Sequence, residues 1–239
     1  MRRHHTPREE LSPRAQIDKL TRQLVRTMQP LLEESAVPPP RTRPIGGHFA
    51  EPYYRSMTAE LEALDFQLLG DFDAADAAAE RDLFTRLLLA ADGSAYAKIL
   101  AAPGEGDDRG VRAIAFGTRF ADRSSVVTWL NWPPRIPSPP QFQEWFVDGD
   151  VPAGTVLGAH RAHVRRTGRE VRPFENAAAI LDEWQYHERE TIAWRRRQGI
   201  HFYEMFIRNI TGENFDTSGV LMLESIRAHP WWLTGGRAA

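Results

Sequence analysis

The sequence predicts an α+β fold, in which an antiparallel β-meander of four to five strands is covered by helices and preceded by an amphipathic N-terminal helix. Two observations lead to this prediction. Turn signals at Asp92-Gly93 and Asp122-Arg123 each separate two runs of strand length, which is typical of β-hairpins. Before and after these hairpins, apolar residues recur at spacings of three and four, as they do in amphipathic helices.

The composition excludes several classes of protein. The 239 residues include 30 Lys and Arg, 32 Asp and Glu, and no cysteine. Without cysteine, the chain cannot form disulfides, thiolate metal sites or a cysteine nucleophile. A net charge of -2 argues against a broadly basic protein, so nucleic acid is not expected as a partner. Lys19 and Lys98 are the only lysines, a skew toward Arg that indicates a high-GC bacterial genome.

The sequence shows no membrane or export signal. No run reaches the roughly 18–20 apolar residues of a membrane span. The basic start at Arg2-Arg3 is not followed by the apolar stretch of a signal peptide. We therefore expect a cytoplasmic protein without a transmembrane segment.

Residues 1–36 are predicted to form a polar tail and an amphipathic helix that begins at Ser12-Pro13. Its apolar stripe consists of Ile17, Leu20, Leu24, Met28 and Leu31. Three interpretations are open: the stripe packs on the protein's own core, pairs with a helix of a partner, or lies on an anionic membrane. Residues 37–50 are rich in Pro and Gly and read as a linker.

The α+β domain is predicted over residues 51–232, followed by a polar tail over 233–239. The expected elements are a helix at 53–64, a strand at 66–72, hairpins at 83–100 and 111–132, helices from Ser138 and over 152–166 and 174–198, a strand at 200–207, and a last helix at 216–227. No repeat of about 20–50 residues is present, which excludes solenoids and propellers.

Histidines on the two longest predicted domain helices are the candidate metal ligands. His160 and His163 share one side of their helix, and His187 lies on the next helix. If these helices pack together, their side chains could bind Zn or Fe in a metal-dependent hydrolase or oxidase. The candidate ligands are His160, His163, His187 and Glu190. The competing interpretation is that each histidine is a hydrogen-bonded residue at the rim of the core.

Motifs for other catalytic chemistry are absent from the sequence. There is no G-x-S-x-G elbow, no HExxH zincin motif and no Gly-Lys-Ser/Thr phosphate loop. Two Arg-rich stretches, 161–172 and 195–197, could hold phosphates or form a solvated, salt-bridged face, and neighbouring glutamates favour the second interpretation.

Large aromatic residues and prolines are concentrated between residues 129 and 146. Trp129, Trp132 and Trp145 could line a groove for a partner or cap the core of the sheet. Together with the absence of catalytic motifs, they favour a non-enzymatic accessory or protein-interaction module without a cofactor. The expected partner is another protein or a second copy of the chain. The candidate contact residues are Leu20, Leu24, Met28, Trp129, Trp132 and Trp145.

Three features together resemble a loose group of uncharacterised bacterial α+β proteins. They are Leu61–Leu69 (LEALDFQLL), the two hairpins, and Leu157–His163 (LGAHRAH). The resemblance spans residues 61–230. It implies the fold, and it implies no activity and no catalytic residue.

Overall fold

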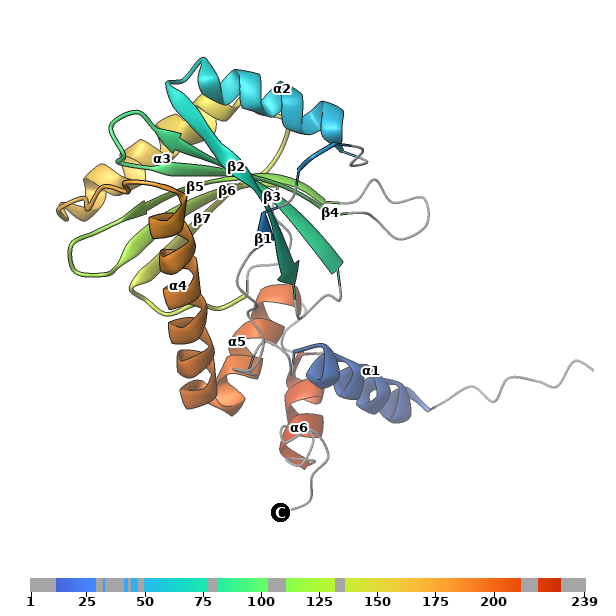
Figure 1. Cartoon of the computed structure of the whole chain (residues 1–239). Coiled ribbons are helices and arrows are strands. Elements are labelled where there is room, and N and C mark those ends of the chain that lie inside the picture. Colours follow the sequence, from blue (N-terminus) through green and yellow to red (C-terminus); the bar gives the residue numbers. More distant parts are fainter. Residues whose placement is uncertain are drawn as a thin grey trace, which may run out of the picture.

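A mixed β-sheet forms the centre of the protein in the computed structural model (Figure 1). The structure describes residues 12–28, 32, 41–42, 44–46, 50–76, 81–102, 111–131, 136–211 and 219–228. The strands are β1 (Arg41–Thr42), β2 (Phe66–Asp76), β3 (Arg81–Ala90), β4 (Tyr96–Ala102), β5 (Val111–Arg119), β6 (Ser125–Leu130) and β7 (Phe142–Val147). Their order in the sheet equals their order in the sequence.

The antiparallel meander expected from the sequence is confirmed for the centre of the sheet. Strands β3 and β4 pair across the Asp92-Gly93 turn, and β5 and β6 pair across Asp122-Arg123. The sheet is nevertheless larger than the four to five antiparallel strands expected. It has seven described strands, of which β1 contains two residues, and β7 pairs with β6 in parallel. The fold class is therefore α+β with a mixed sheet.

Strand β7 replaces a helix that the sequence analysis predicted from Ser138. The prediction rested on Phe142, Trp145 and Phe146, whose spacing fits one helical turn. A segment of six residues fits a strand equally well, with Phe142 and Phe146 on one face and Trp145 on the other. Parallel pairing with β6 makes this segment a strand. At the start of the strand, the Phe142 amide donates a hydrogen bond to the Pro139 carbonyl at 2.9 Å.

The predicted strand over 200–207 was also wrong. These residues belong to helix α5 (Ile200–Thr211), which follows α4 (Ala177–Gln198) after a sharp break at Gly199, where φ is +54°. Aromatic and β-branched residues favour strands in isolation. Here Tyr203 and Ile207 lie four residues apart on one helical face, where they are buried against other helices.

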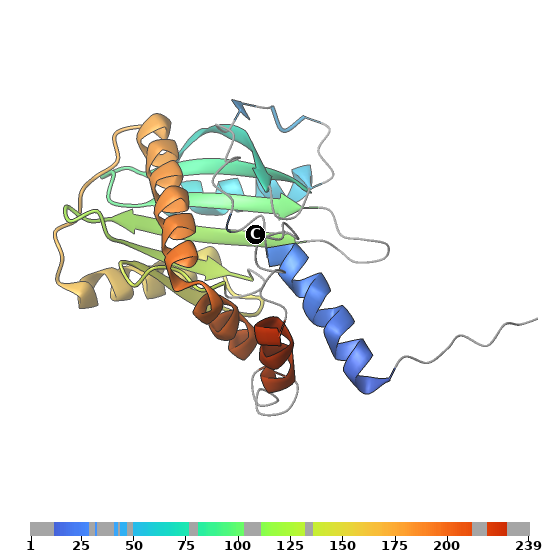
Figure 2. The same ribbon diagram turned by 90° about the horizontal axis from the view of Figure 1, so that it is seen from below.

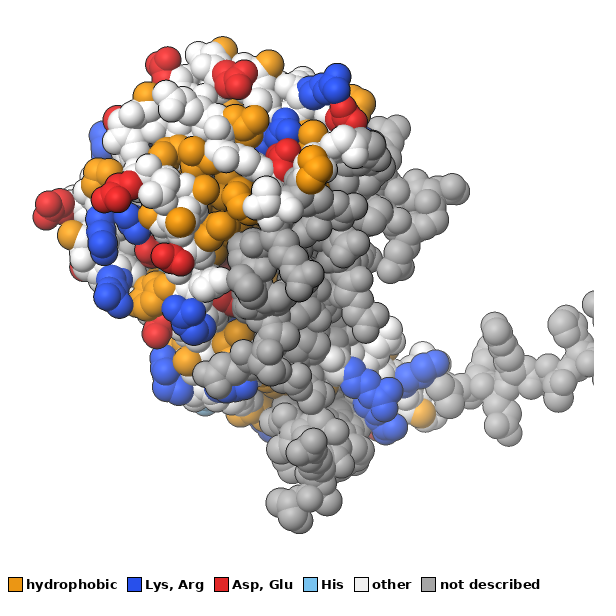
Figure 3. Space-filling model, viewed as in Figure 1, with side chains coloured by type: hydrophobic (Ala, Val, Ile, Leu, Met, Phe, Trp, Pro, Cys, Tyr) orange, Lys and Arg blue, Asp and Glu red, His pale blue; other side chains and the backbone are white. Residues whose placement is uncertain are grey.

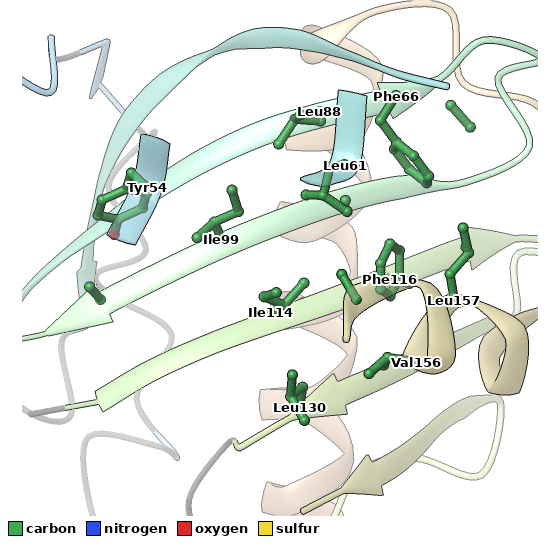
Figure 4. Packing of buried hydrophobic residues seen from close by; sticks show 14 of the residues in the cluster. Tyr54, Leu61, Phe66, Leu88, Ile99, Ile114, Phe116, Leu130, Val156 and Leu157 are labelled. Atoms are coloured by element: carbon green, nitrogen blue, oxygen red, sulfur yellow. The ribbon is translucent and has the colours of Figure 1, made fainter. Parts of the chain in front are cut away.

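Helices cover both faces of the sheet (Figure 2). One face carries α2 (Glu51–Glu62) and α3 (Ala153–Thr167), and the other carries α4. Figure 4 shows the core beneath α2 and α3, with side chains from both layers pointing toward one another. Its labelled residues are Tyr54, Leu61, Phe66, Leu88, Ile99, Ile114, Phe116, Leu130, Val156 and Leu157. On the other face, Ile180 and Trp184 of α4 pack with Tyr96.

The N-terminal helix α1 (Pro13–Met28) packs on the C-terminal helices α5 and α6 (Val220–Ala228). The three share a second apolar cluster: Val25, Met28, Phe202, Tyr203, Phe206, Ile207, Leu223 and Ile226. The Ser225 hydroxyl donates to Asp18 at 2.5 Å across this contact. Of the interpretations left open by the sequence, the structure shows packing on the protein's own core. Met28 is 2 % exposed and Leu24 is half-buried, whereas Leu20 is 59 % exposed.

Gly117 provides a test of the packing beneath α4. It lies opposite Tyr96 in the β4–β5 ladder, and an added Cβ would collide with the Tyr96 ring. Phe174 and Trp184 hold that ring in edge-to-face contacts at 5.4 and 5.9 Å. We expect Gly117→Ala to lower the free energy of unfolding by about 1–3 kcal/mol through overpacking, measured by urea denaturation.

The matched control is Gly158→Ala on the exposed side of α3, where an added Cβ meets nothing within 4 Å. This change should raise stability by about 0.5–1 kcal/mol, since Ala is the better helix former. Equal effects of the two substitutions would contradict the described packing of Tyr96.

A second pair of variants tests the position of α1. Met28→Ala removes a side chain that is 2 % exposed, so it should cost about 2–5 kcal/mol of unfolding free energy. Leu20→Ala removes one that is 59 % exposed and should change stability by no more than about 0.5 kcal/mol. If Met28→Ala were as mild as Leu20→Ala in urea unfolding, α1 would not be packed on α5 and α6.

Candidate functional site

His160 lies on the buried side of α3, between the helix and the sheet. Its Nε2 is 2.9 Å from the Thr118 hydroxyl of β5, and its Nδ1 is 3.1 Å from the Thr128 hydroxyl of β6. The side chain is 1 % exposed. Burial is the main cause that lowers the pKa of His160 to about 3, and the charges of His163 and Arg161 act in the same direction. The imidazole is therefore neutral at physiological pH.

The direction of each hydrogen bond around His160 follows from its neighbours. The Thr118 hydroxyl donates to the Ser94 carbonyl at 3.0 Å, so Thr118 accepts the proton on His160 Nε2. His160 Nδ1 then carries a lone pair and accepts from the Thr128 hydroxyl. Both ring nitrogens are used within the protein, and neither has a lone pair left for a metal ion.

Of the other proposed metal ligands, His163 lies near His160 at the same Thr128 hydroxyl, whereas His187 and Glu190 lie apart from both on α4. His163 is on the same helix, with Nδ1 3.5 Å from the Thr128 hydroxyl. His187 belongs to α4, across the sheet, where its ring stacks on Phe142 at 3.9 Å. Glu190 is half-buried on the same helix. Because the sheet lies between α3 and α4, the helix packing on which the metal hypothesis depends does not occur. Within the described ranges, no three His, Asp or Glu side chains are grouped closely enough to hold a metal ion.

His187 instead contacts Glu183 beneath α4. Its Nε2 lies 3.4 Å from Glu183, and Glu183 lies 3.6 Å from the Arg119 guanidinium. Burial raises the pKa of Glu183, but the contacts with His187 and Arg119 outweigh burial and hold it below its usual range. Arg119 also donates to the Pro173 carbonyl at 2.7 Å. These contacts tie β5 to the N-terminal half of α4 and to the segment before it.

Trp145 marks the most exposed aromatic surface among the described residues. It belongs to β7 and is 41 % exposed. The His163 ring stacks on it with centroids 4.1 Å apart and an interplanar angle of 23°, and the Arg166 guanidinium lies 5.2 Å from its centroid. A shallow hollow adjoins this contact. We call this area the Trp145 surface, which consists of Trp145, Ala159, Ala162, His163, Arg165 and Arg166.

The Trp145 surface carries positive charge that other side chains leave unneutralised. Residues 161–172 contain five Arg and a single acidic residue. Arg169 lies 3.6 Å from Asp122. For Arg161, Arg165 and Arg166, no described carboxylate lies within ion-pair distance. In Figure 3, basic side chains gather along the edge of the molecule over α4 and the end of α3.

The second Arg-rich stretch, 195–197, contributes to packing. Arg195 is 7 % exposed and donates to the Pro137 carbonyl at 3.2 Å, and Arg196 donates to the Leu32 carbonyl. The Arg195 guanidinium also lies 5.6 Å from the centre of the Phe202 ring. These contacts connect the end of α4 with the helical cluster.

Lys98 is a candidate reactive group that lies outside the residues predicted from the sequence. Its Nζ lies between two indole rings, 4.2 Å from the centroid of Trp129 and 4.7 Å from that of Trp184. Burial lowers its pKa to about 8, although the charges of Glu144 and Glu188 act in the opposite direction. A lysine with a lowered pKa is a candidate nucleophile. The two rings also cover the amine, so its contacts join β4, β6 and α4.

Of the three tryptophans predicted to bind a partner, Trp145 alone is exposed in the described structure. Trp129 is 7 % exposed, and its Nε1 donates to Glu144 at 3.1 Å. Trp132 lies outside the described residues. One available signal for Lys98 was its rarity, since it is one of two lysines and interrupts an apolar strand. Successive side chains of β7 point to opposite faces of the sheet, which exposes Trp145. The incorrect helix prediction for this segment did not indicate that exposure.

Comparisons with known proteins identify no relative. No family model matches the sequence, and no curated protein or solved structure matches it significantly. In the described part of the chain, no helix is both long and apolar enough to span a membrane.

The state of Lys98 can be measured directly. In protein labelled with ¹³C at the lysine ε carbon, one of the two Lys signals should titrate near pH 8 and disappear in Lys98→Met. Unfolded lysine keeps its proton to about pH 10.4, so the unfolded state holds more protons above pH 8. Stability should therefore rise from pH 8 to about 9.5, and this gain should be lost as the pH falls back through 8, below which Lys98 is protonated in both states and adds no further change.

Lys98→Met should remove this pH dependence in urea unfolding, and Lys19→Met should retain it. The measurement stops near pH 9.5 because tyrosines of the unfolded state ionise at about pH 10, and stability then falls as the pH rises further. A Lys98 signal that titrates at the ordinary lysine value would contradict the sandwich between the two indoles.

Proposed function

We propose that this protein is a non-enzymatic interaction module that binds an acidic segment of a protein partner at the Trp145 surface. The observation that carries the proposal is the exposed Trp145, held in place by His163 on one side and near Arg166. Tryptophan and arginine are the residue types most enriched at interaction hot spots.

Contacts within the protein prepare Trp145 for binding. The stacked His163 ring restricts the indole before any partner arrives, so less side-chain entropy is lost on association. Burial, together with the Arg166 charge, lowers the pKa of His163 and favours its neutral form. A neutral imidazole stacks on the indole without placing a further cation beside Arg165 and Arg166.

The charge of the surface selects the partner. Arg165 and Arg166 have no described ion-pair partner and lie on the exposed side of α3, and a carboxylate-bearing segment would neutralise them through charge-assisted hydrogen bonds. Complementary charge raises the rate of association and makes binding sensitive to salt. An acidic chain with one or two apolar side chains fits this combination of guanidinium groups and exposed indole.

The proposed partner contact lies at the Trp145 surface and not on the N-terminal helix, where the sequence also predicted contact residues. Met28 and Leu24 are packed against α5 and α6, which leaves Leu20 as the exposed member of the three. Val220 and Leu221 of α6 are 37 % exposed. These side chains are apolar but lack the stacked, charged arrangement found around Trp145.

A fluorescence-polarisation assay tests the proposal with a defined probe. A labelled peptide rich in Glu and Asp, with two Leu, should bind the full chain, and its affinity should fall with added NaCl. Trp145→Ala should raise the Kd about 30-fold, corresponding to about 2 kcal/mol at a hot spot. Arg166→Gln should weaken binding and reduce the salt dependence.

The matched control is Leu68→Ala, which removes an apolar side chain of similar exposure from β2 and should leave the Kd unchanged. The same peptide with Lys in place of each acidic residue should not bind. Equal binding of both peptides, or an unchanged Kd in Trp145→Ala, would refute the proposal. A single-stranded oligonucleotide that binds more tightly than the acidic peptide would assign the surface to nucleic acid instead.

A further inference from the structure

A small pocket opens beside α3, on the side of His160 away from Trp145. Its volume is about 130 Å³. Phe66, Leu157 and Val171 form much of its apolar wall, and Thr118 and His160 contribute polar atoms. An apolar protein cavity of about 150 Å³ holds a molecule of the size of benzene, so a ligand of one ring or one branched chain fits here.

The polar atoms in the wall are already satisfied within the protein. Thr118 donates to the Ser94 carbonyl and accepts from His160 Nε2. His160 Nδ1 accepts from Thr128, and burial keeps the imidazole uncharged. A polar group inserted here would lose its hydrogen bonds to water without gaining a partner from these residues. The interior therefore favours an apolar group.

The mouth of the pocket has the opposite character. Arg161 and Arg165 lie one helical turn apart on α3, line the pocket and are exposed. Asp92 senses the Arg161 charge, but its pKa is lowered mainly by hydrogen bonds from Ser94 and less by Arg161. Asp92 accepts from the Ser94 amide at 2.9 Å, which holds its carboxylate on its own turn. The two guanidinium groups are thus placed to bind an anion.

We propose that this pocket binds a small monocarboxylate with an apolar body of about the size of a phenyl ring, its carboxylate at Arg161 and Arg165. The apolar body would occupy the space beside His160, and the carboxylate would stay at the mouth in contact with water. This pocket is a second site, separate from the proposed partner surface. Arg165 borders both sites, so the variants below are placed at residues that line only one of the two.

Calorimetry on the full chain can test the site with benzoate as the probe. Benzyl alcohol keeps the ring and lacks the charge, and acetate keeps the charge and lacks the ring. Benzoate should bind at least tenfold more tightly than either, because it alone uses both parts of the pocket. Arg161→Gln should weaken benzoate binding about tenfold, since a charged hydrogen bond is lost.

Three variants distinguish binding in this pocket from binding elsewhere on the protein. Val164→Phe places a ring in the pocket from α3 and should abolish benzoate binding. Arg189→Gln removes an exposed arginine from α4, across the sheet, and should leave it unchanged. Trp145→Ala should also leave it unchanged, so failure of the partner surface would not affect this result.

Amide chemical shifts provide a second measurement that does not depend on the folding of Val164→Phe. Benzoate should perturb the amides of Ser94, Ala95 and Val164 in the wild-type protein. The absence of benzoate binding, shifts confined to other regions, or equal binding of benzyl alcohol and benzoate would each overturn the proposal.

Discussion

Both faces of the central strands are apolar, so the sheet requires a cover on each side. In β5 and β6 nearly every described side chain is buried, whether it points toward α2 and α3 or toward α4. Such strands are stable only when helices lie on both faces. This constraint places α3 and α4 on opposite sides of the sheet and thereby decides which polar residues can meet. His160 and His163 are separated from His187 for this reason.

Covering both faces also buries polar groups, and the structure satisfies them in two different ways. On the α3 face, His160 forms hydrogen bonds with Thr118 of β5 and Thr128 of β6, whose side chains both point toward α3. On the α4 face, the amine of the half-buried Lys98 lies between two indole rings. Each arrangement links a helix to the sheet and uses the polar group within the protein, before any ligand is considered.

Helix α3 connects the two surfaces proposed to bind ligands. Its buried side contributes Leu157 and His160, its rim contributes His163 to the stack with Trp145, and its exposed side carries Arg161, Arg165 and Arg166. Because the helix is held by the core below, the arginines project from a fixed support. A rigid helix with an apolar pocket on one side and an exposed indole on the other can present both sites without rearrangement.

The sequence by itself determined those elements whose signals are local. The turns at Asp92-Gly93 and Asp122-Arg123 indicated two hairpins correctly, and the long apolar periodicities indicated α1, α2, α3 and α4. Segment 142–147 was too short for its period to distinguish a strand from a helix, and residues 200–207 form a helix because α1 and α6 bury one side of it. For the candidate sites, the sequence identified His163, Trp145 and the Arg-rich stretch but not their contact. Only the tertiary structure decided which face each residue occupies, because that depends on strand pairing and helix placement between residues far apart in the chain.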